Sequence, residues 1–194
     1  MSRLQVLVHR PRRTLAALAT VLVAVGVTAA SGADFTATTA NPTNTFAAGT
    51  LAMSNSNAGA AVLTASNLRP GGSAALGTVD IGNTGSLSGA FTLTRGTVTD
   101  SSSSYPLSSK LNTVVTDCGT FVGATPPVCG NSDDVNVYTG TLSAMGAGTP
   151  ISALGTYAAS EKHRYQFSVA LDSSADNNYQ AGTSQTVFTW NATS

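Results

Sequence analysis

Few residues in this 194-residue chain could carry out chemistry. It contains two histidines, His9 and His163, and nine acidic residues. Glu161 lies two residues before His163, whereas a zinc-peptidase helix carries two histidines one turn apart with a glutamate between them. We interpret Glu161 to His163 as a solvated cluster where a strand begins, not as a zinc site. Because the sequence also lacks a Gly-x-Ser-x-Gly motif and a P-loop, it assigns no catalytic residue, no metal ligand and no cofactor.

Two acidic loops offer oxygen atoms to a calcium ion. One holds Asp172, Asp176, Asn177 and Asn178, and the other holds Asn131, Asp133 and Asp134. Neither matches an EF-hand loop, and calcium takes about six to eight oxygen ligands. Asn and Asp also form turns through hydrogen bonds to their own backbone. We favour turns in both loops and leave calcium binding as the alternative.

The first 33 residues have the order of an export signal. Four arginines lie within residues 3–13, an apolar run covers 15–27, and small residues continue to Ala33. The run is shorter than the ~20 residues that span a bilayer, although a retained membrane anchor is the alternative. We predict cleavage between Ala33 and Asp34, with Ala30 as the second choice. Arg12 and Arg13 leave the twin-arginine route open beside the general secretory route.

Cleavage would change the charge of the protein. The signal holds four of the nine basic residues and none of the nine acids, so residues 34–194 carry a net charge of −4 with histidine neutral. This charge argues against nucleic acid and anionic lipid as partners, because both require a basic face. After processing we expect a single domain, residues 34–194, with no membrane span.

Cys118 and Cys129 are the only cysteines. An exported chain reaches an oxidising compartment, where two cysteines are expected to form a disulfide. The short loop that it closes predicts a stabilisation of about 3 kcal/mol. A metal site or a redox pair is the alternative, but it requires further ligands or a Cys-x-x-Cys spacing.

The hydrophobic pattern predicts an all-β fold. Residues 87–94, 165–171 and 183–190 alternate between two faces, as half-buried strands do. We expect further strands at 45–53, 60–66, 74–81, 111–117 and 135–139, and short helical turns at 107–110 and 141–145. Residues 118–134 would form the longest loop. This spacing of strands favours a two-sheet sandwich of jelly-roll type.

Several short motifs follow one another in a characteristic order. They are Asn44 to Leu51, which includes Phe46, Gly49 and Thr50; Asn67 to Gly72, with Leu68, Pro70 and Gly71; Asn83 to Leu87, with Gly85; Asn177 to Gly182, with Tyr179 and Gln180; and Val187 to Thr193, with Phe188 and Trp190. Together they resemble the TasA/camelysin family of exported bacterial proteins. None of these side chains is chemically reactive, so the motifs describe a scaffold.

The resemblance implies a jelly-roll sandwich and processing by a dedicated signal peptidase. It also implies a location at the cell surface or in the extracellular biofilm matrix. TasA-like members build extracellular fibres, and camelysin-like members are described as metalloendopeptidases.

A short β-prone arm follows the predicted cleavage site. It comprises Asp34, Phe35, Thr36, Ala37, Thr38, Thr39 and Ala40. No charged residue lies between Asp34 and Arg69, and charge is the usual protection of a strand against pairing with another chain. We expect the arm to act as a donor strand that adds to a sheet edge of a neighbouring molecule. Fraying of the terminus is the alternative.

These observations lead to three hypotheses about function. The first is a secreted structural protein that assembles with itself or with other surface or matrix proteins. The second is a camelysin-type metalloendopeptidase. The third is a binding or adhesion module for surface polymers or a partner protein.

Overall fold

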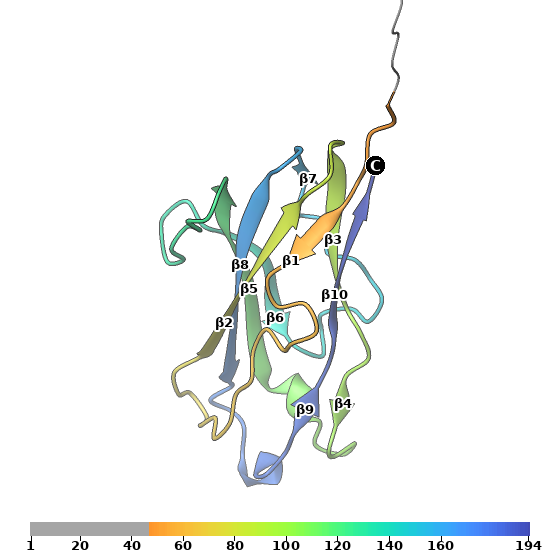
Figure 1. Ribbon diagram of the computed structural model, residues 1–194. Helices are drawn as coiled ribbons and strands as arrows, with labels where there is room; N and C mark the ends of the chain where they lie inside the picture. Colours follow the sequence, from red (N-terminus) through yellow and green to blue (C-terminus); the bar gives the residue numbers. More distant parts are fainter. Residues whose placement is uncertain (1–46) are drawn as a thin grey trace, which may run out of the picture. The chain divides into compact units, whose positions relative to one another are not determined.

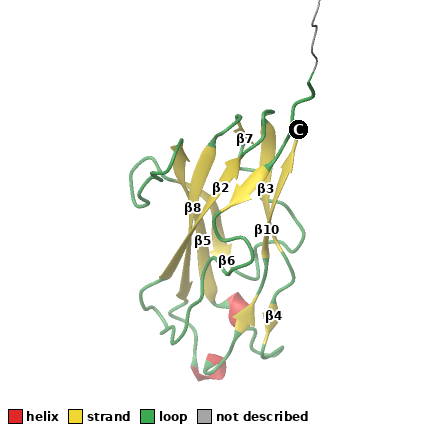
Figure 2. Ribbon diagram, viewed as in Figure 1, coloured by secondary structure: helices red, strands yellow, loops and turns green. Residues whose placement is uncertain are grey.

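The computed structural model describes residues 47–194, which form one compact unit. The predicted signal, its cleavage site at Ala33 and Asp34, the arm at 34–40 and Phe46 lie outside the described residues. Figures 1 and 2 show two antiparallel sheets that face each other, which confirms the predicted all-β sandwich. Within 47–194, no helix is long and apolar enough to cross a membrane.

The larger sheet has five strands in the order β1-β2-β8-β5-β6, all antiparallel to their neighbours. The strands are β1 (Met53–Asn55), β2 (Ala75–Asn83), β8 (Lys162–Leu171), β5 (Leu111–Phe121) and β6 (Val135–Thr141). Alternate residues of the central strands point inward, so Ile81, Val115 and Phe167 are fully buried. This is the period-two pattern that a sheet with one solvated face requires.

The smaller sheet has three strands in the order β10-β3-β7. They are β10 (Phe188–Thr193), β3 (Gly89–Arg95) and β7 (Thr156–Tyr157). A separate pair, β4 (Thr99–Asp100) with β9 (Ser184–Gln185), lies near one end of the sandwich (Figure 1). Two 3-10 turns, η1 (Leu107–Ser109) and η2 (Asn177–Tyr179), lie at the same end (Figure 2). The first of them was predicted at 107–110.

The core between the sheets is dominated by aromatic side chains. Phe91 stacks on Tyr157 with ring centroids 4.0 Å apart, and Tyr165 packs on Trp190 at 4.9 Å. Each fully buried side chain of this size contributes about 2–3 kcal/mol by removing apolar surface from water. Packing in this shared core therefore stabilises the paired strands more than the β-propensity of their individual residues does.

The strand predicted at 45–53 is wrong for its described part, because only Met53 belongs to β1. The preceding segment bonds to a turn instead of a strand. The Thr50 carbonyl accepts hydrogen bonds from the backbone N–H groups of Ser86 and Leu87, and the Ala52 carbonyl accepts one from Thr84. A turn cannot continue a ladder, so this segment stays irregular.

The strand predicted at 60–66 is also absent. A Cβ added to Gly77 on β2 would lie 2.1 Å from the Val62 carbonyl oxygen. Val62 therefore crosses close to the backbone of β2, where only glycine leaves room for it. This position packs Val62 against the main core but does not place its backbone along a strand edge.

Two further boundaries differ from the prediction. The strand at 183–190 is divided into β9 and β10, which pair with β4 and β3 respectively. The change of partner occurs at Thr186 and Val187, opposite Gly96, whose N–H donates to the Val187 carbonyl. The loop predicted at 118–134 is shorter, because β5 continues through Cys118 to Phe121 after a register shift between Asp117 and Thr120.

Candidate functional site

A polar cluster lies between the two sheets at one end of the core. We name it the histidine cluster; it comprises Asp117, Tyr157, Glu161, His163 and Tyr165. His163 Nδ1 lies 2.8 Å from Asp117 Oδ2, and its Nε2 lies 3.3 Å from Glu161 Oε1. The imidazole stacks on Tyr157 with ring centroids 4.2 Å apart. The phenol oxygens of Tyr157 and Tyr165 form a hydrogen bond inside the core.

The prediction that Glu161 to His163 lies where a strand begins is confirmed, because β8 starts at Lys162, but the prediction that this cluster is solvated is wrong for His163. Its side chain is only 12% exposed, and those of Asp117 and Glu161 are 14% and 27% exposed. Position 163 continues the inward face of β8 that Tyr165 and Phe167 occupy, so the strand carries the imidazole inward. Asp117 and Glu161 supply the hydrogen-bond partners that a buried polar ring requires.

The cluster changes the ionisation of its members. Burial lowers the pKa of His163, but the hydrogen bonds and negative charges of Asp117 and Glu161 outweigh this effect and raise the pKa above its ordinary value. Burial raises the pKa of both Tyr157 and Tyr165 far above that of free tyrosine. The tyrosines therefore stay neutral near pH 7, while the imidazole keeps its proton to a higher pH than a free histidine does.

The arrangement resembles the acid–histidine pair of a hydrolase in one respect only. In a triad one imidazole nitrogen is oriented by an acid and the other accepts the proton of a nucleophile. Here acids occupy both nitrogens of His163. Residues 47–194 contain no group of three or more His, Cys, Asp or Glu side chains placed to hold a metal ion.

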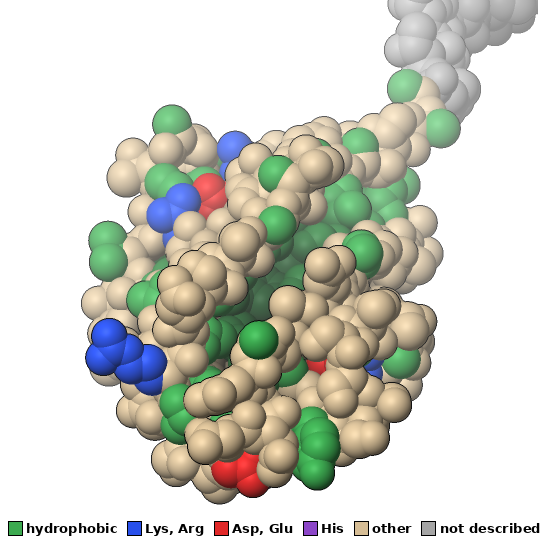
Figure 3. Space-filling model, turned by 90° about the horizontal axis from the view of Figure 1, so that it is seen from below, with side chains coloured by type: hydrophobic (Ala, Val, Ile, Leu, Met, Phe, Trp, Pro, Cys, Tyr) green, Lys and Arg blue, Asp and Glu red, His purple; other side chains and the backbone are tan. Residues whose placement is uncertain are grey.

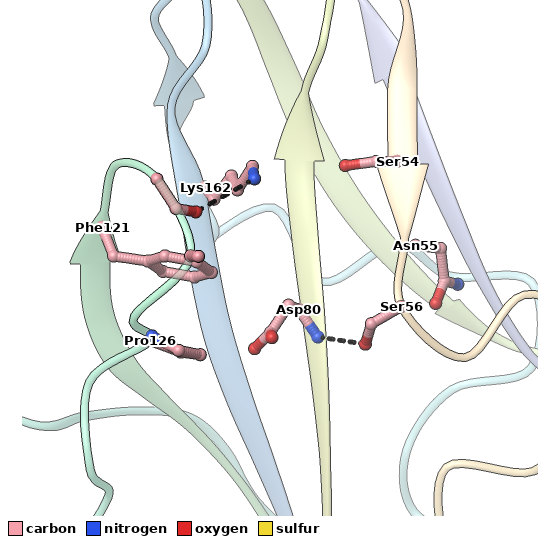
Figure 4. A pocket seen from close by; sticks show the side chains of 9 residues that line it. Ser54, Asn55, Ser56, Asp80, Phe121, Pro126 and Lys162 are labelled. Carbon is pink, nitrogen blue, oxygen red and sulfur yellow. Dashed lines mark hydrogen bonds between the residues drawn. The ribbon is translucent and has the colours of Figure 1, made fainter.

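A pocket of about 250 Å³ opens on the outer face of the larger sheet (Figure 4). Four segments form it: β1 and the residue after it, β2, the first residue of β8, and the end of β5 with the loop that follows. Its lining comprises Ser54, Asn55, Ser56, Asp80, Phe121, Gly123, Ala124, Pro126 and Lys162. The loop is part of the ring closed by the disulfide.

The predicted disulfide between Cys118 and Cys129 is present, with Cα atoms 4.9 Å apart. Cys118 lies in the shifted part of β5 and is buried, whereas Cys129 belongs to the loop. The bond therefore ties residues 119–128, which we name the disulfide loop, to the larger sheet.

The motif residues near the beginning of the described chain come together in space. A Cβ on Gly85 would lie 2.2 Å from the Thr50 carbonyl oxygen, and one on Gly49 would overlap the Leu87 side chain. Asn83 is fully buried beside them. Its amide nitrogen donates to the Leu87 carbonyl at 2.7 Å, and its side-chain oxygen accepts from the Gly85 N–H at 2.9 Å.

The other motif residues form turns or core. Gly71 has φ +67°, and its N–H donates to the Leu171 carbonyl; Leu68 packs on the smaller core cluster. Tyr179 ends η2, where the Gly182 N–H donates to its carbonyl. Phe188 and Trp190 belong to β10 and the main core. The remaining motif positions, Leu51, Pro70 and Gln180, line these same turns and the segment before β1.

Both acidic loops contain hydrogen-bonded turns. The Asp172 carboxylate accepts from the N–H and hydroxyl of Ser174, and these bonds lower its pKa to about 2. Asp176 caps η2 by accepting from the Asn178 N–H. In the other loop, Asp134 accepts from the N–H groups of Gly130 and Asn131. The bonds of Asp172 and Asp176 are those of Asx turns, whereas Asp134 accepts from backbone N–H groups that precede it.

The outer edge of β10, which we name the open edge, pairs with no other strand of the described part of the chain. The outer edge of β6 is equally unpaired there. No charged residue follows Asp176, so β10 lacks the usual protection of an edge strand, whereas Asp133 and Asp134 directly precede β6.

From below, Figure 3 shows a hollow with hydrophobic side chains at its floor.

Sequence reasoning missed the partners of His163 and the pocket. Asp117 lies 46 positions from His163, and the two meet only through the β5–β8 pairing. Arg95 was also missed: the residue is 5% exposed, and its guanidinium donates to the carbonyls of Gly96, Ser143 and Met145. The available signal for Arg95, Asp117 and His163 was the inward register of these positions on their strands.

The chain matches no protein-family model, and no curated protein sequence matches it.

Proposed function

We propose that this protein is an exported structural protein of the cell surface or biofilm matrix, which assembles by strand addition. The observation that carries the proposal is the open edge, a six-residue strand without a charged or proline residue at the border of a sandwich. Such an edge presents unpaired N–H and C=O groups to another chain. The sequence resemblance to the TasA/camelysin family supports the same proposal.

The donor in this proposal is the arm, residues 34–40 of a second copy. Like β10, it carries no charge after Asp34 and is rich in Thr. An added strand beside β10 would alternate its side chains between solvent and core, as β10 does with exposed Thr189 and buried Trp190. Phe35, Ala37 and Thr39 would share the inward side.

Addition of the arm to its own molecule is an alternative to addition to a neighbour. The Leu51 side chain and the Thr193 carbonyl both lie beside Gly89, so the segment before β1 passes close to the end of β10. In this proposal the arm would add either to the open edge of its own molecule, which gives a closed monomer, or to that of a neighbour, which gives a polymer. Strand exchange between copies of one chain is a known route to such polymers.

The test compares four proteins by light scattering and electron microscopy over a range of concentrations. Protein beginning at Asp34 should form fibres, whereas protein beginning at Thr43 and the Phe35→Asp variant should stay monomeric. Phe35→Leu is the matched control and should still assemble, because it keeps an apolar side chain at the inward position.

A second pair of variants tests the acceptor. Asn191→Lys should stop assembly, because a lysine on an edge strand opposes pairing, whereas Asn136→Lys on β6 should not. Assembly by the protein beginning at Thr43, or equal effects of the two lysines, would contradict the proposal. A monomer that requires the arm for its stability would show the closed arrangement instead.

A further inference from the structure

We propose that the pocket beside the disulfide loop binds a sugar ring that bears a carboxylate, as a unit of an acidic polysaccharide. This inference is independent of assembly, because the pocket lies on the larger sheet and the open edge belongs to the smaller one. It would give the protein a second partner, of a different chemical class from a copy of itself.

The size and position of the pocket fit one ring of a longer chain. Sites for drug-sized ligands enclose about 300–1,000 Å³, and this pocket encloses about 250 Å³. It opens outward between β1 and the disulfide loop, so neighbouring units of a polymer can continue into solvent on either side (Figure 4).

One wall of the pocket is apolar and flat. The Phe121 ring points into it, and Pro126 lies beneath the ring (Figure 4). The axial C–H bonds of a pyranose form a flat apolar surface, which matches the electron-rich face of an aromatic ring. An aromatic wall with a few placed polar groups is the usual composition of a specific small-molecule site.

The opposite wall supplies hydrogen-bonding groups suited to hydroxyls. Asn55 Oδ1 accepts from the Asn57 N–H at 2.8 Å, which orients the amide. Its NH₂ group donates to no other residue of the described chain. The Ser54 hydroxyl donates to the Gly82 carbonyl and the Ser56 hydroxyl donates to Asn57 Oδ1, so both oxygens face a ligand as acceptors. Ser56 Oγ also accepts from the Asp80 N–H at 2.9 Å.

The charges around the pocket favour an anion. Asp80 forms a two-point ion pair with Arg164, at 2.7 and 2.9 Å, so its charge is compensated. The Lys162 ammonium lies over the Phe121 ring, 5.8 Å from its centroid, and donates to the Gly123 carbonyl at 3.3 Å. It pairs with no carboxylate of the described chain, so two N–H donors are left for an anion. Residues 47–194 contain five basic and eight acidic residues, so Lys162 is a positively charged group in a domain of net negative charge.

The disulfide prepares this site before a ligand arrives. Phe121 lies three residues after Cys118, and the loop returns to Cys129. The bond restricts the loop that carries Phe121, Gly123 and Pro126, and a restricted loop loses less entropy when it binds.

The experiment titrates the disulfide-bonded protein with three probes and follows amide chemical shifts by NMR. The probes are tetragalacturonate, its neutral methyl ester, and tetraglutamate, which has the charge without the ring. We expect tetragalacturonate to shift the amides of the pocket and the other two probes to bind at least tenfold more weakly. Binding should weaken as salt is added, because Lys162 is exposed to screening.

Variants identify the groups responsible. Lys162→Gln should remove the preference for the acid over its methyl ester, and Phe121→Leu should weaken binding about tenfold, the equivalent of the stacking energy of one aromatic pair. Val122→Ala is the matched control, since Val122 is 82% exposed and does not line the pocket.

Three results would overturn the proposal: no shifts with tetragalacturonate at millimolar concentration, equal binding of the acid and its ester, or equal binding of tetraglutamate. The last would identify an acidic peptide as the ligand class. Thermal unfolding of each variant shows whether it is folded, and Lys162→Arg provides a second test of the charge should Lys162→Gln be unstable.

Discussion

His163 and Asp117 form a hydrogen bond between two strands of one sheet, with Nδ1 and Oδ2 2.8 Å apart and both side chains more than four-fifths buried. Asp117 lies on β5 at the start of the register shift, and His163 lies on β8 opposite Thr120. The pair therefore spans the irregular part of the β5–β8 ladder, where the regular cross-strand register is interrupted. A buried charged hydrogen bond contributes about 1.5–3 kcal/mol.

The first prediction concerns pH. Because the folded pKa of His163 is raised, its stabilising effect is complete below about pH 6.5 and disappears as the pH rises through the folded pKa. His163→Gln should lower the free energy of unfolding by about 2 kcal/mol at pH 5.5 and by less at pH 9. Urea unfolding at several pH values measures this. A difference that grows with pH would contradict it, and NMR titration of His163 gives the pKa directly.

The second prediction concerns the disulfide. Replacing Cys118 and Cys129 together by Ser should lower the free energy of unfolding by about 3 kcal/mol, because the unfolded chain gains the freedom of the closed loop. Chemical denaturation measures the change. Reducing agent should destabilise the native protein by the same amount and leave the double variant unaffected, which serves as the control.

The third prediction concerns Asn83, the buried side chain at the centre of the first motif group. Asn83→Ala should cost about 3 kcal/mol, because the carbonyls of Leu87 and Tyr157 and the Gly85 N–H lose their partner. Thr84→Ala, at the exposed neighbouring position, should change the unfolding midpoint little. Similar effects of both substitutions would show that the hydrogen bonds of Asn83 are unimportant.

The fourth prediction concerns the close passage of Val62 over β2. Gly77→Ala should cost about 1–3 kcal/mol, because the new methyl group would overlap the Val62 carbonyl and displace its segment. Limited proteolysis should then cut within 57–66. Gly96→Ala is the control: its nearest atom would lie at 3.3 Å, so it should be tolerated better. Protection of 57–66 in the Gly77 variant would rule out this account.

The fifth prediction concerns export. Protein recovered from the medium of an expressing bacterium should begin at Asp34, because the small residues up to Ala33 follow the apolar run. Intact-mass spectrometry decides between this start, cleavage after Ala30 and a retained anchor. A secreted species that still contains residues 15–27 would contradict the prediction.

The sequence was sufficient for the fold class because alternation along β3 and β8 is strong: Phe91 and Leu93, and likewise Tyr165 and Phe167, recur at every second position and are all buried. It also identified the disulfide, since two cysteines allow one pairing. It failed where tertiary contacts override local pattern. Val62 is a residue type common in strands, but its backbone passes over Gly77 instead of pairing along a strand. The Thr50 carbonyl accepts from the turn at Ser86 and Leu87 instead of from a strand.

The candidate sites were less predictable for the same reason. His163 and Asp117, or Phe121 and Ser54, lie far apart in the chain and come together through strand pairing. Only the register of the sheet determines such neighbours, and a shift of one residue would place them on opposite faces.

The absence of charge along β10 has a consequence for the surroundings in which the protein could work. An association through that strand contains no ion pair to screen and releases no counterions, so brine and fresh water should support it about equally. Temperature is a different matter, because the apolar contribution to such an association weakens on cooling. We therefore expect association through β10 to be insensitive to salinity and to weaken in the cold.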